Sequence, residues 1–258
     1  MAKTIAVVNQ KGGVGKTTSA VNLAAAVAAK GYKVLLMDID PQGNATSGLG
    51  INKREIKISS YDVIINAIPV DKAMLKTEFA NLWTIPSSMN LAGAELELVD
   101  MAHREAKIKN SLALIKNQFD FIFLDCPPSL GLITLNGLCA ADTVLVPIQC
   151  EYYALEGLSQ LISTIRQIKR LYNPHIDIEG VLLTMFDGRL NLTHQVVDEL
   201  KRFFPKKVYS TVIPRNVKLS EAPSYGMPIL YYDKKSKGAE AYNALADEFL
   251  KMNGKGAI

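Results

Sequence analysis

Short apolar runs alternate with longer helical patterns along this chain, and that alternation limits the fold more than any other feature. The apolar runs lie at residues 4–8, 33–38, 121–125, 143–148, 180–185 and 208–213. The helical patterns lie at residues 17–30, about 92–117, 151–171, 191–204 and about 238–252. Short runs that are almost continuously hydrophobic are typical of strands covered on both faces. The alternation therefore predicts an α/β fold, with a mostly parallel twisted sheet and helices on both of its faces.

We expect one domain spanning residues 1–258, because no internal repeat, low-complexity segment or linker divides the chain. A composition of 48% hydrophobic and 21% charged residues is ordinary for a globular protein and excludes a disordered one. No run approaches the roughly 18 apolar residues that span a bilayer, and polar residues from position 9 onward exclude a signal peptide. Cys126, Cys139 and Cys150 follow no zinc or disulfide spacing, so the expected compartment is the reducing cytoplasm.

A glycine-rich loop joins the first expected strand to the first expected helix. It consists of Lys11, Gly12, Gly13, Val14, Gly15, Lys16, Thr17 and Thr18. Glycines let successive N–H groups turn around an anion, and the start of the helix adds the positive end of its dipole. Lys16 is placed to reach the β- and γ-phosphates of a nucleotide, and Thr17 to put its hydroxyl on Mg²⁺. Because position 10 is Gln10, the loop departs from the strict phosphate-loop pattern, and Lys11 is an additional base.

Carboxylates follow two of the other expected strands. Residues 33–38 lead into Asp38 and Asp40, and residues 121–124 lead into Asp125. Because parallel strands bring their carboxyl ends to one edge of the sheet, these side chains should meet the glycine loop there. A phosphate site needs such carboxylates for the metal ion and for the attacking water. The sequence therefore predicts a nucleotide site at this edge.

Positive charge is concentrated in residues 189–218. The formal net charge of the chain is +4, and this segment alone holds seven bases against two acids. The bases are Arg189, Lys201, Arg202, Lys206, Lys207, Arg215 and Lys218, and the acids are Asp198 and Glu199. A local surplus of this kind indicates a polyanionic partner, although a solvated surface explains it about equally well.

Taken together, these segments resemble the deviant Walker-type ATPases of the ParA/MinD class, and within it the chromosomal, Soj-type ParA partition proteins. The resemblance covers nearly the whole chain. Beyond residues 11–18, 38–44 and 125–129, it is carried by residues 85–88, 91–95, 146–157, 213–217, 219–224 and 237–239. It implies a P-loop NTPase fold and an ATP- and Mg²⁺-dependent ATPase in which two protomers enclose two ATP molecules.

The resemblance also implies roles for single residues. Lys11 matches the lysine that reaches the phosphates bound by the partner protomer, Lys16 the phosphate-loop lysine, and Asp40 the residue that orients the attacking water. Asp125 matches the carboxylate behind the Mg²⁺ shell, with Thr17 and Asp38 near the same metal. Pro214, Arg215 and Asn216 lie in the segment that matches the family's adenine contact.

In this family the ATP-bound homodimer binds double-stranded DNA without sequence preference, on the nucleoid. Arg189 and Lys218 occupy positions where related proteins carry DNA-contacting arginines; lysine at position 218 keeps the charge but loses the planar fork of arginine. Hydrolysis is slow alone and is stimulated by DNA and by a ParB-type partner, a feature implied by the resemblance only.

Three other interpretations remain. A MinD-like membrane-cycling ATPase would need an amphipathic C-terminal helix, whereas the apolar residues of the last expected helix are typical of a face packed on the domain; we therefore expect no stable membrane association. An iron–sulfur carrier would need shared cysteine thiolates, and the three cysteines are better explained as small buried residues. A nucleotide-binding scaffold without hydrolysis is disfavoured by the presence of both Lys16 and Asp40.

Overall fold

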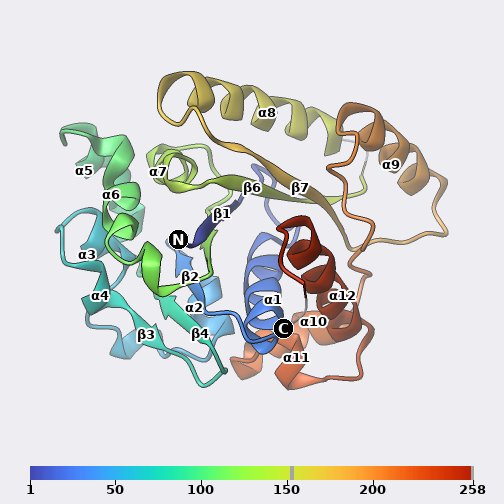
Figure 1. Cartoon of the computed structure of the whole chain (residues 1–258), viewed down its shortest axis with the longest axis horizontal. Helices are drawn as coiled ribbons and strands as arrows, with labels where there is room; N and C mark the ends of the chain where they lie inside the picture. Colours follow the sequence, from blue (N-terminus) through green and yellow to red (C-terminus); the bar gives the residue numbers. More distant parts are fainter. Residues whose placement is uncertain (152–153, 257–258) are drawn as a thin grey trace.

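A mostly parallel sheet forms the centre of the computed structural model, which describes residues 1–151 and 154–256 (Figure 1). Across this sheet the described strands follow the order β3 (Leu75–Lys76), β4 (Leu82–Ile85), β2 (Val34–Asp38), β5 (Phe121–Asp125), β1 (Lys3–Val7), β6 (Thr143–Gln149) and β7 (Asp177–Thr184). Neighbouring strands run parallel except for the short pair β3–β4 at one edge. The predicted α/β sheet is thus confirmed, and its parallel strands end along one common edge.

Helices cover both faces of the sheet (Figure 1). One face carries α1 (Lys16–Ala29), α2 (Asn44–Gly48), α10 (Val217–Glu221), α11 (Ile229–Tyr232) and α12 (Lys237–Met252). The other carries α3 (Ser60–Ile64), α4 (Val70–Ala73), α5 (Leu91–Val99), α6 (Lys107–Ala113), α7 (Leu132–Ala140), α8 (Ala154–Leu171) and α9 (Asn191–Phe203). None of the helices among the described residues combines the length and apolar character that crossing a membrane requires.

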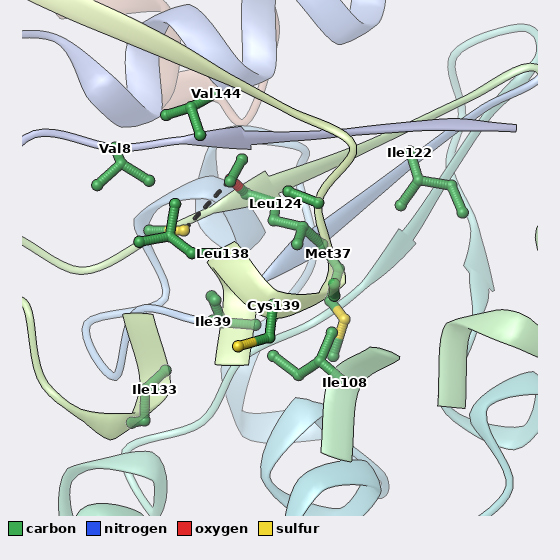
Figure 2. Packing of buried hydrophobic residues seen from close by; sticks show 14 of the residues in the cluster. Val8, Met37, Ile39, Ile108, Ile122, Leu124, Ile133, Leu138, Cys139 and Val144 are labelled. Carbon is green, nitrogen blue, oxygen red and sulfur yellow. Dashed lines mark hydrogen bonds between the residues drawn. The ribbon is translucent and has the colours of Figure 1, made fainter. Parts of the chain in front are cut away.

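The core consists of two apolar clusters, one on each side of the sheet. Successive residues of a strand point to opposite faces, so β5 contributes Ile122 and Leu124 to one cluster and Phe121 and Phe123 to the other. Figure 2 shows the first cluster, where strand side chains such as Leu124 meet side chains of α6 and α7. This two-sided burial explains why the strands are continuously hydrophobic.

Helix α1 is rich in alanine because it is enclosed on nearly all sides. Ala24, Ala25, Ala26 and Ala28 are fully buried, and α1 packs between the sheet and α12. A helix that is apolar all round is a buried helix, and small side chains let its neighbours approach closely. The hydroxyl of Ser19 is hydrogen-bonded to that of Tyr242 at 3.1 Å where α1 packs on α12. The first helical turn is therefore firmly held beneath the glycine loop.

The single helix expected over about 92–117 is wrong. Helix α5 ends at Val99, His103 adopts a left-handed backbone with φ 52°, and α6 begins only at Lys107. The side chain of Asn136 in α7 holds this break: it accepts from the amide of Lys107 at 3.0 Å and donates to the carbonyl of Arg104 at 2.7 Å. A distant residue thus interrupts a helical pattern that local sequence could not show to be broken.

The strand expected at 208–213 is also wrong. This segment meets β7 only at isolated bridges, Val181 with Val208 and Phe186 with Pro214, and it forms no continuous ladder. Tyr209 packs so closely on Gly180 that a Cβ there would lie 2.3 Å from the ring, which shows how tightly the segment packs as it runs parallel to β7. The sheet also contains β3 and β4, which the sequence pattern did not indicate.

The other helices that the sequence predicted are found, whereas α2, α3, α4, α7, α10 and α11 were not among the expected helical patterns. Those expected at 17–30, 191–204 and 238–252 are found with ends within one residue. Helix α8 runs from Ala154 to Leu171, and residues 152–153 of the helix expected over 151–171 lie outside the described residues. These elements leave the loops after β1, β2, β5 and β7 together at the carboxyl edge of the sheet.

Candidate functional site

The glycine loop between β1 and α1 is held open by its own glycines and by two neighbouring strands. Gly13 and Gly15 take left-handed φ values of 75° and 84°, which suit glycine and turn the loop into the start of α1. The side chain of Asn9 donates to the carbonyl of Pro147 in β6 at 2.8 Å, and the hydroxyl of Thr184 in β7 donates to the carbonyl of Val14 at 2.8 Å. The loop is therefore fixed in position before any ligand arrives.

Lys16 lies at the first position of α1 with its ammonium group directed into the loop. The side chain is 7% exposed, and its Nζ donates to the carbonyl of Lys11 at 3.0 Å. Burial lowers the pKa of Lys16 below its ordinary value, while the charges of Asp125 and Asp40 act in the opposite direction. A partly desolvated cation at a helix N-terminus is suited to bind an anion, as expected for a phosphate site.

Asp38 and Asp125 lie side by side, because the residues that end β2 and β5 are register partners. Both are fully buried, yet their surroundings differ. Asp38 accepts hydrogen bonds from the amide of Thr46 at 2.8 Å, the hydroxyl of Thr46 at 2.7 Å and the amide of Asp40 at 3.1 Å. Burial still raises the pKa of Asp38 to about 6. Asp38 is thus fully engaged in holding its own loop.

Neither carboxylate oxygen of Asp125 accepts a hydrogen bond of ordinary geometry among the described residues, although the Thr17 hydroxyl lies near enough to act on it. Burial, and then the charge of Asp38, raises the pKa of Asp125 well above its usual range, while Thr17 and Lys16 act in the opposite direction. A buried carboxylate without partners is costly unless something else satisfies it. Its position beside Thr17 fits a hydrated Mg²⁺ ion held between the loop and this carboxylate.

The described residues contain no group of three or more His, Cys, Asp or Glu side chains that could enclose a metal by themselves. That observation is compatible with Mg²⁺, which keeps several waters and binds through one or two carboxylates together with phosphate oxygens. It gives no support to a cysteine-held cluster: Cys126 and Cys139 are buried, and all three cysteines are free. Burial raises the pKa of each thiol.

A cavity of about 300 Å³ lies over the glycine loop. Asp40, which is 6% exposed, lies on its wall together with Lys16 and Thr17. One carboxylate oxygen of Asp40 accepts from the amide of Gln42 at 2.9 Å. The other lining residues include Gly12, Gly13, Gly15, Thr18, Asn44, Pro128 and Met185. The sequence-predicted Lys16, Thr17 and Asp40 are thus brought together around one space.

A second cavity of about 300 Å³ adjoins the first, and Gly15, Thr18 and Met185 line both. Pro214, Arg215 and Asn216 form part of its wall, so the segment that runs beside β7 reaches the loop side of the molecule. The buried Oδ1 of Asn216 has no hydrogen-bond partner among the described residues. A space with largely apolar walls is suited to receive a planar base.

Two residues of this edge escaped the sequence analysis. Thr184 supports the loop, and Met185 lines both cavities with a left-handed backbone at φ 48°, an unusual conformation for a long side chain. They stand at the end of β7, so their position at the end of a predicted strand was the available signal. Their approach to residues 14–18 is long-range and could not be read from spacing.

Lys11 does not join the cavity over the loop. Its ammonium group instead forms an ion pair with Glu151, and both side chains are about half exposed, at 41% and 47%. Exposed pairs of this kind contribute roughly 0–1 kcal/mol and are easily exchanged for another partner. Lys11 is therefore free to move at little cost.

In the folded chain, nearby acids offset several of the positive charges of the basic segment, residues 189–218. Arg189 pairs with Asp187 at 2.6 Å and Lys218 with Glu221 at 2.8 Å, two acids that lie just outside residues 189–218. Arg202 pairs with Glu199 and Lys207 with Asp177. Hydrogen bonds from Arg189 lower the pKa of Asp187 to about 2, so this acid stays ionised. Arg189 remains 89% exposed and accessible to a partner.

Comparisons with known proteins agree with this geometry. A sequence model of the family described as "AAA domain" matches residues 2–178. The chain is 56% identical to the sporulation initiation inhibitor protein Soj of Bacillus subtilis, over 96% of this chain and 98% of that protein. It is 51% identical to the chromosome partitioning protein ParA of Myxococcus xanthus, over 98% and 89%. A Mycobacterium smegmatis structure named cobyrinic acid a,c-diamide synthase, with bound ATP analogue and magnesium, superposes with a TM-score of 0.86 at 35% identity and covers both chains fully.

Proposed function

The chain belongs to the family of ParA- and Soj-type chromosome-partitioning ATPases, and on that premise we propose that it is a nucleotide-operated DNA-binding switch. In the proposed cycle ATP and Mg²⁺ bind, two protomers dimerise around the nucleotides, the dimer binds DNA without sequence preference, and hydrolysis releases it. The proposal follows the partitioning relatives, which share more of the sequence than the synthase does.

The observation that carries the proposal is the junction of the two cavities at Gly15, Thr18 and Met185. We assign the cavity over the loop to the phosphates, bound by the N–H groups of residues 12–18 and by Lys16. We assign the second cavity to adenine, which would lie against Pro214, Arg215 and Asn216. Such a pair of joined cavities has the chemistry of an adenine nucleotide site.

Thr17 and Asp125 are the proposed ligand and outer-shell partner of Mg²⁺, which neutralises charge on the phosphates when it is bound. Asp38 stands beside them, but its oxygens already accept three hydrogen bonds, so we assign it to the charge and structure behind the metal rather than to direct coordination. One carboxylate oxygen of Asp40 accepts from the amide of Gln42, and the other oxygen is available to orient the attacking water.

Lys11 is the proposed contribution of one protomer to the site of its partner. A cation placed on the phosphates from the second protomer would stabilise charge during hydrolysis and make dimerisation depend on ATP. In the monomer the side chain is held by Glu151, and the weakness of exposed ion pairs allows this exchange. The proposed dimer therefore forms when phosphate offers Lys11 a stronger partner.

Arg189 and Lys218 are the proposed DNA contacts, duplicated by the dimer. Non-specific binding through phosphates should be strongly salt-dependent. We further propose that a ParB-type protein and DNA stimulate hydrolysis, and that the protein works in the cytoplasm on the nucleoid. The apolar residues of α12, including Tyr242, Leu245 and Phe249, are buried in the core, which supports DNA over a lipid surface as the partner of the ATP form.

The test is binding of Asp40→Ala to duplex DNA of unrelated sequence, first with ATP and then with ADP. The substitution should keep ATP bound while blocking hydrolysis, so the DNA complex should persist with ATP and be absent with ADP. An Arg189→Ala/Lys218→Ala pair on the same background should weaken the complex. Equal binding with both nucleotides would contradict the switch, and ATP-dependent binding to anionic vesicles in its place would favour the MinD-like alternative.

A further inference from the structure

The loop that carries Asp40 is held from the side by Ser87. Ser87 follows β4, the strand paired in parallel with β2, so it lies beside the residues that follow Asp38. Its hydroxyl donates to the carbonyl oxygen of Asp40 at 2.5 Å, and its amide donates to the hydroxyl oxygen of Thr46 at 2.9 Å. Ser87 is fully buried, so no water competes for either bond.

These bonds close a ring. The Ser87 hydroxyl donates to the carbonyl of Asp40, and the amide of Asp40 donates to the carboxylate of Asp38. That carboxylate also accepts from the Thr46 hydroxyl, whose oxygen in turn accepts from the amide of Ser87. Thr46, Asp38 and Ser87 are each 0% exposed. A closed and desolvated network in which each member is hydrogen-bonded specifies one geometry instead of several. The ring joins the strand end at Asp38 to both sides of the Asp40 backbone.

The geometry points to Ser87 as a positioning residue that fixes the carboxylate of Asp40 for hydrolysis. This inference rests on the proposed role of Asp40. The amide of Asp40 is fixed by Asp38, and its carbonyl is fixed by Ser87 and by the amide of Gly43 at 2.9 Å. The next residue is Pro41, whose locked φ leaves the loop little freedom to compensate if the carbonyl turns. With both peptide groups held, the Cα–Cβ bond of Asp40 has a fixed direction, and the amide of Gln42 then holds one carboxylate oxygen.

Ser87 itself does not line either cavity, and its hydroxyl donates to the carbonyl of Asp40, so removal of that hydroxyl acts on hydrolysis through Asp40. The neighbouring Ser88 offers a matched control. Its hydroxyl is hydrogen-bonded to that of Ser59 at 3.1 Å, away from Asp40. The two adjacent serines differ in what their hydroxyls hold, which is what a serine-to-alanine change removes, and Ser88 is partly exposed whereas Ser87 is buried.

The experiment compares Ser87→Ala with Ser88→Ala in the full chain, by phosphate release with ATP and Mg²⁺ and by ADP affinity. Because an error of about 1 Å in a catalytic group can cost up to ~100-fold, we expect Ser87→Ala to lower kcat roughly 10-fold. ADP affinity should stay within about two-fold of the unsubstituted protein, since the loop of residues 11–18 is untouched. Ser88→Ala should match the unsubstituted protein in both measurements.

A second pair keeps the test independent of folding. Ser87→Thr and Ser87→Val have nearly the same volume and differ in the hydroxyl, so any packing defect is common to both. Ser87→Thr should hydrolyse ATP faster than Ser87→Val, also by roughly 10-fold. Equal rates in this pair, or an unchanged kcat in Ser87→Ala, would overturn the inference, as would a parallel loss of ADP affinity.

Asp40→Ala distinguishes this inference from the proposed function. If Asp40→Ala hydrolyses ATP normally, the role of Asp40 itself is wrong, whatever Ser87→Ala does. If Asp40→Ala is inactive while Ser87→Ala is unimpaired, only the positioning role fails. In Asp40→Ala/Ser87→Ala the second substitution should add no further loss, because Ser87 acts through the side chain already removed.

Discussion

The carboxyl edge of the sheet, where the glycine loop lies, and the basic segment of residues 189–218 hold their charged side chains in two different ways. At the edge, Lys16, Asp38, Asp40 and Asp125 are all buried and held by backbone or by the ends of strands. In the basic segment, bases such as Arg189 are exposed and paired with acids two or three residues away. The first arrangement is fixed before binding and tolerates little change. The second is adjustable, and its strength depends on how many small interactions form at once.

The largest effect should come from removing the buried cation. Lys16→Ala removes the buried cation that we propose binds the phosphates, and we expect ATP affinity to fall about 1,000-fold. Isothermal titration with ATP and Mg²⁺ measures this directly. Lys30→Ala is a matched control just after the same helix, where the Lys30 side chain pairs with Asp247. The affinity of this variant for ATP should be unchanged. A modest loss in Lys16→Ala would show that the edge is less preorganised than its burial indicates.

Asp125→Asn should separate function from stability at the same edge. The substitution keeps the shape and removes a buried charge whose oxygens have no partner among the described residues. We expect the nucleotide-free protein to become more stable by about 1 kcal/mol, because burial and the neighbouring Asp38 oppose that charge more strongly than Thr17 and Lys16 favour it. Hydrolysis should fall about 100-fold as the metal loses its outer-shell carboxylate. Thermal unfolding without nucleotide and phosphate release are the two measurements; a less stable variant would contradict the assignment of Asp125 as an uncompensated charge.

The basic segment should respond in smaller steps. Arg189→Ala/Lys218→Ala should weaken non-specific DNA binding by the ATP form about 10-fold at moderate salt, because fewer phosphates are neutralised and fewer counterions are released. The slope of log affinity against log salt should become shallower by about 0.9 for each phosphate that the variant no longer neutralises. Fluorescence anisotropy over a salt series measures both. An unchanged slope would mean that these two bases do not touch phosphates.

The smallest effect tests the ion pairs themselves. Asp187→Asn removes the acid that holds Arg189, so Arg189 should contact DNA without first breaking an ion pair. Because exposed pairs contribute only roughly 0–1 kcal/mol, we expect DNA affinity to rise about two- to three-fold. The same anisotropy assay applies, with Asp177→Asn as a control for a second acid of the surface that pairs with Lys207. A fall in affinity would show that Asp187 orders Arg189 for DNA rather than competing with it.

Sequence reasoning succeeded where the structure is local. The run from β1 through the glycine loop into α1, and the aspartates that end β2 and β5, follow from neighbouring residues and are found as predicted. It failed where distant residues decide. Asn136 breaks the helix expected at 92–117, and residues 208–213 run beside β7 with isolated bridges in place of a continuous ladder. Thr184, Met185 and Ser87 were missed for the same reason, since each meets the site only after the strands are placed side by side.

The two-sided core also has a consequence for insertions and deletions. Because each strand alternates its side chains between two clusters, adding one residue inside β5 would exchange Phe123 and Leu124 between the two faces at one stroke. The same change would rotate Asp125 away from Asp38, since the pair depends on the register of β2 and β5. The geometry of this edge therefore depends on the number of residues in each central strand, and that number is constrained as strictly as the side chains of the site.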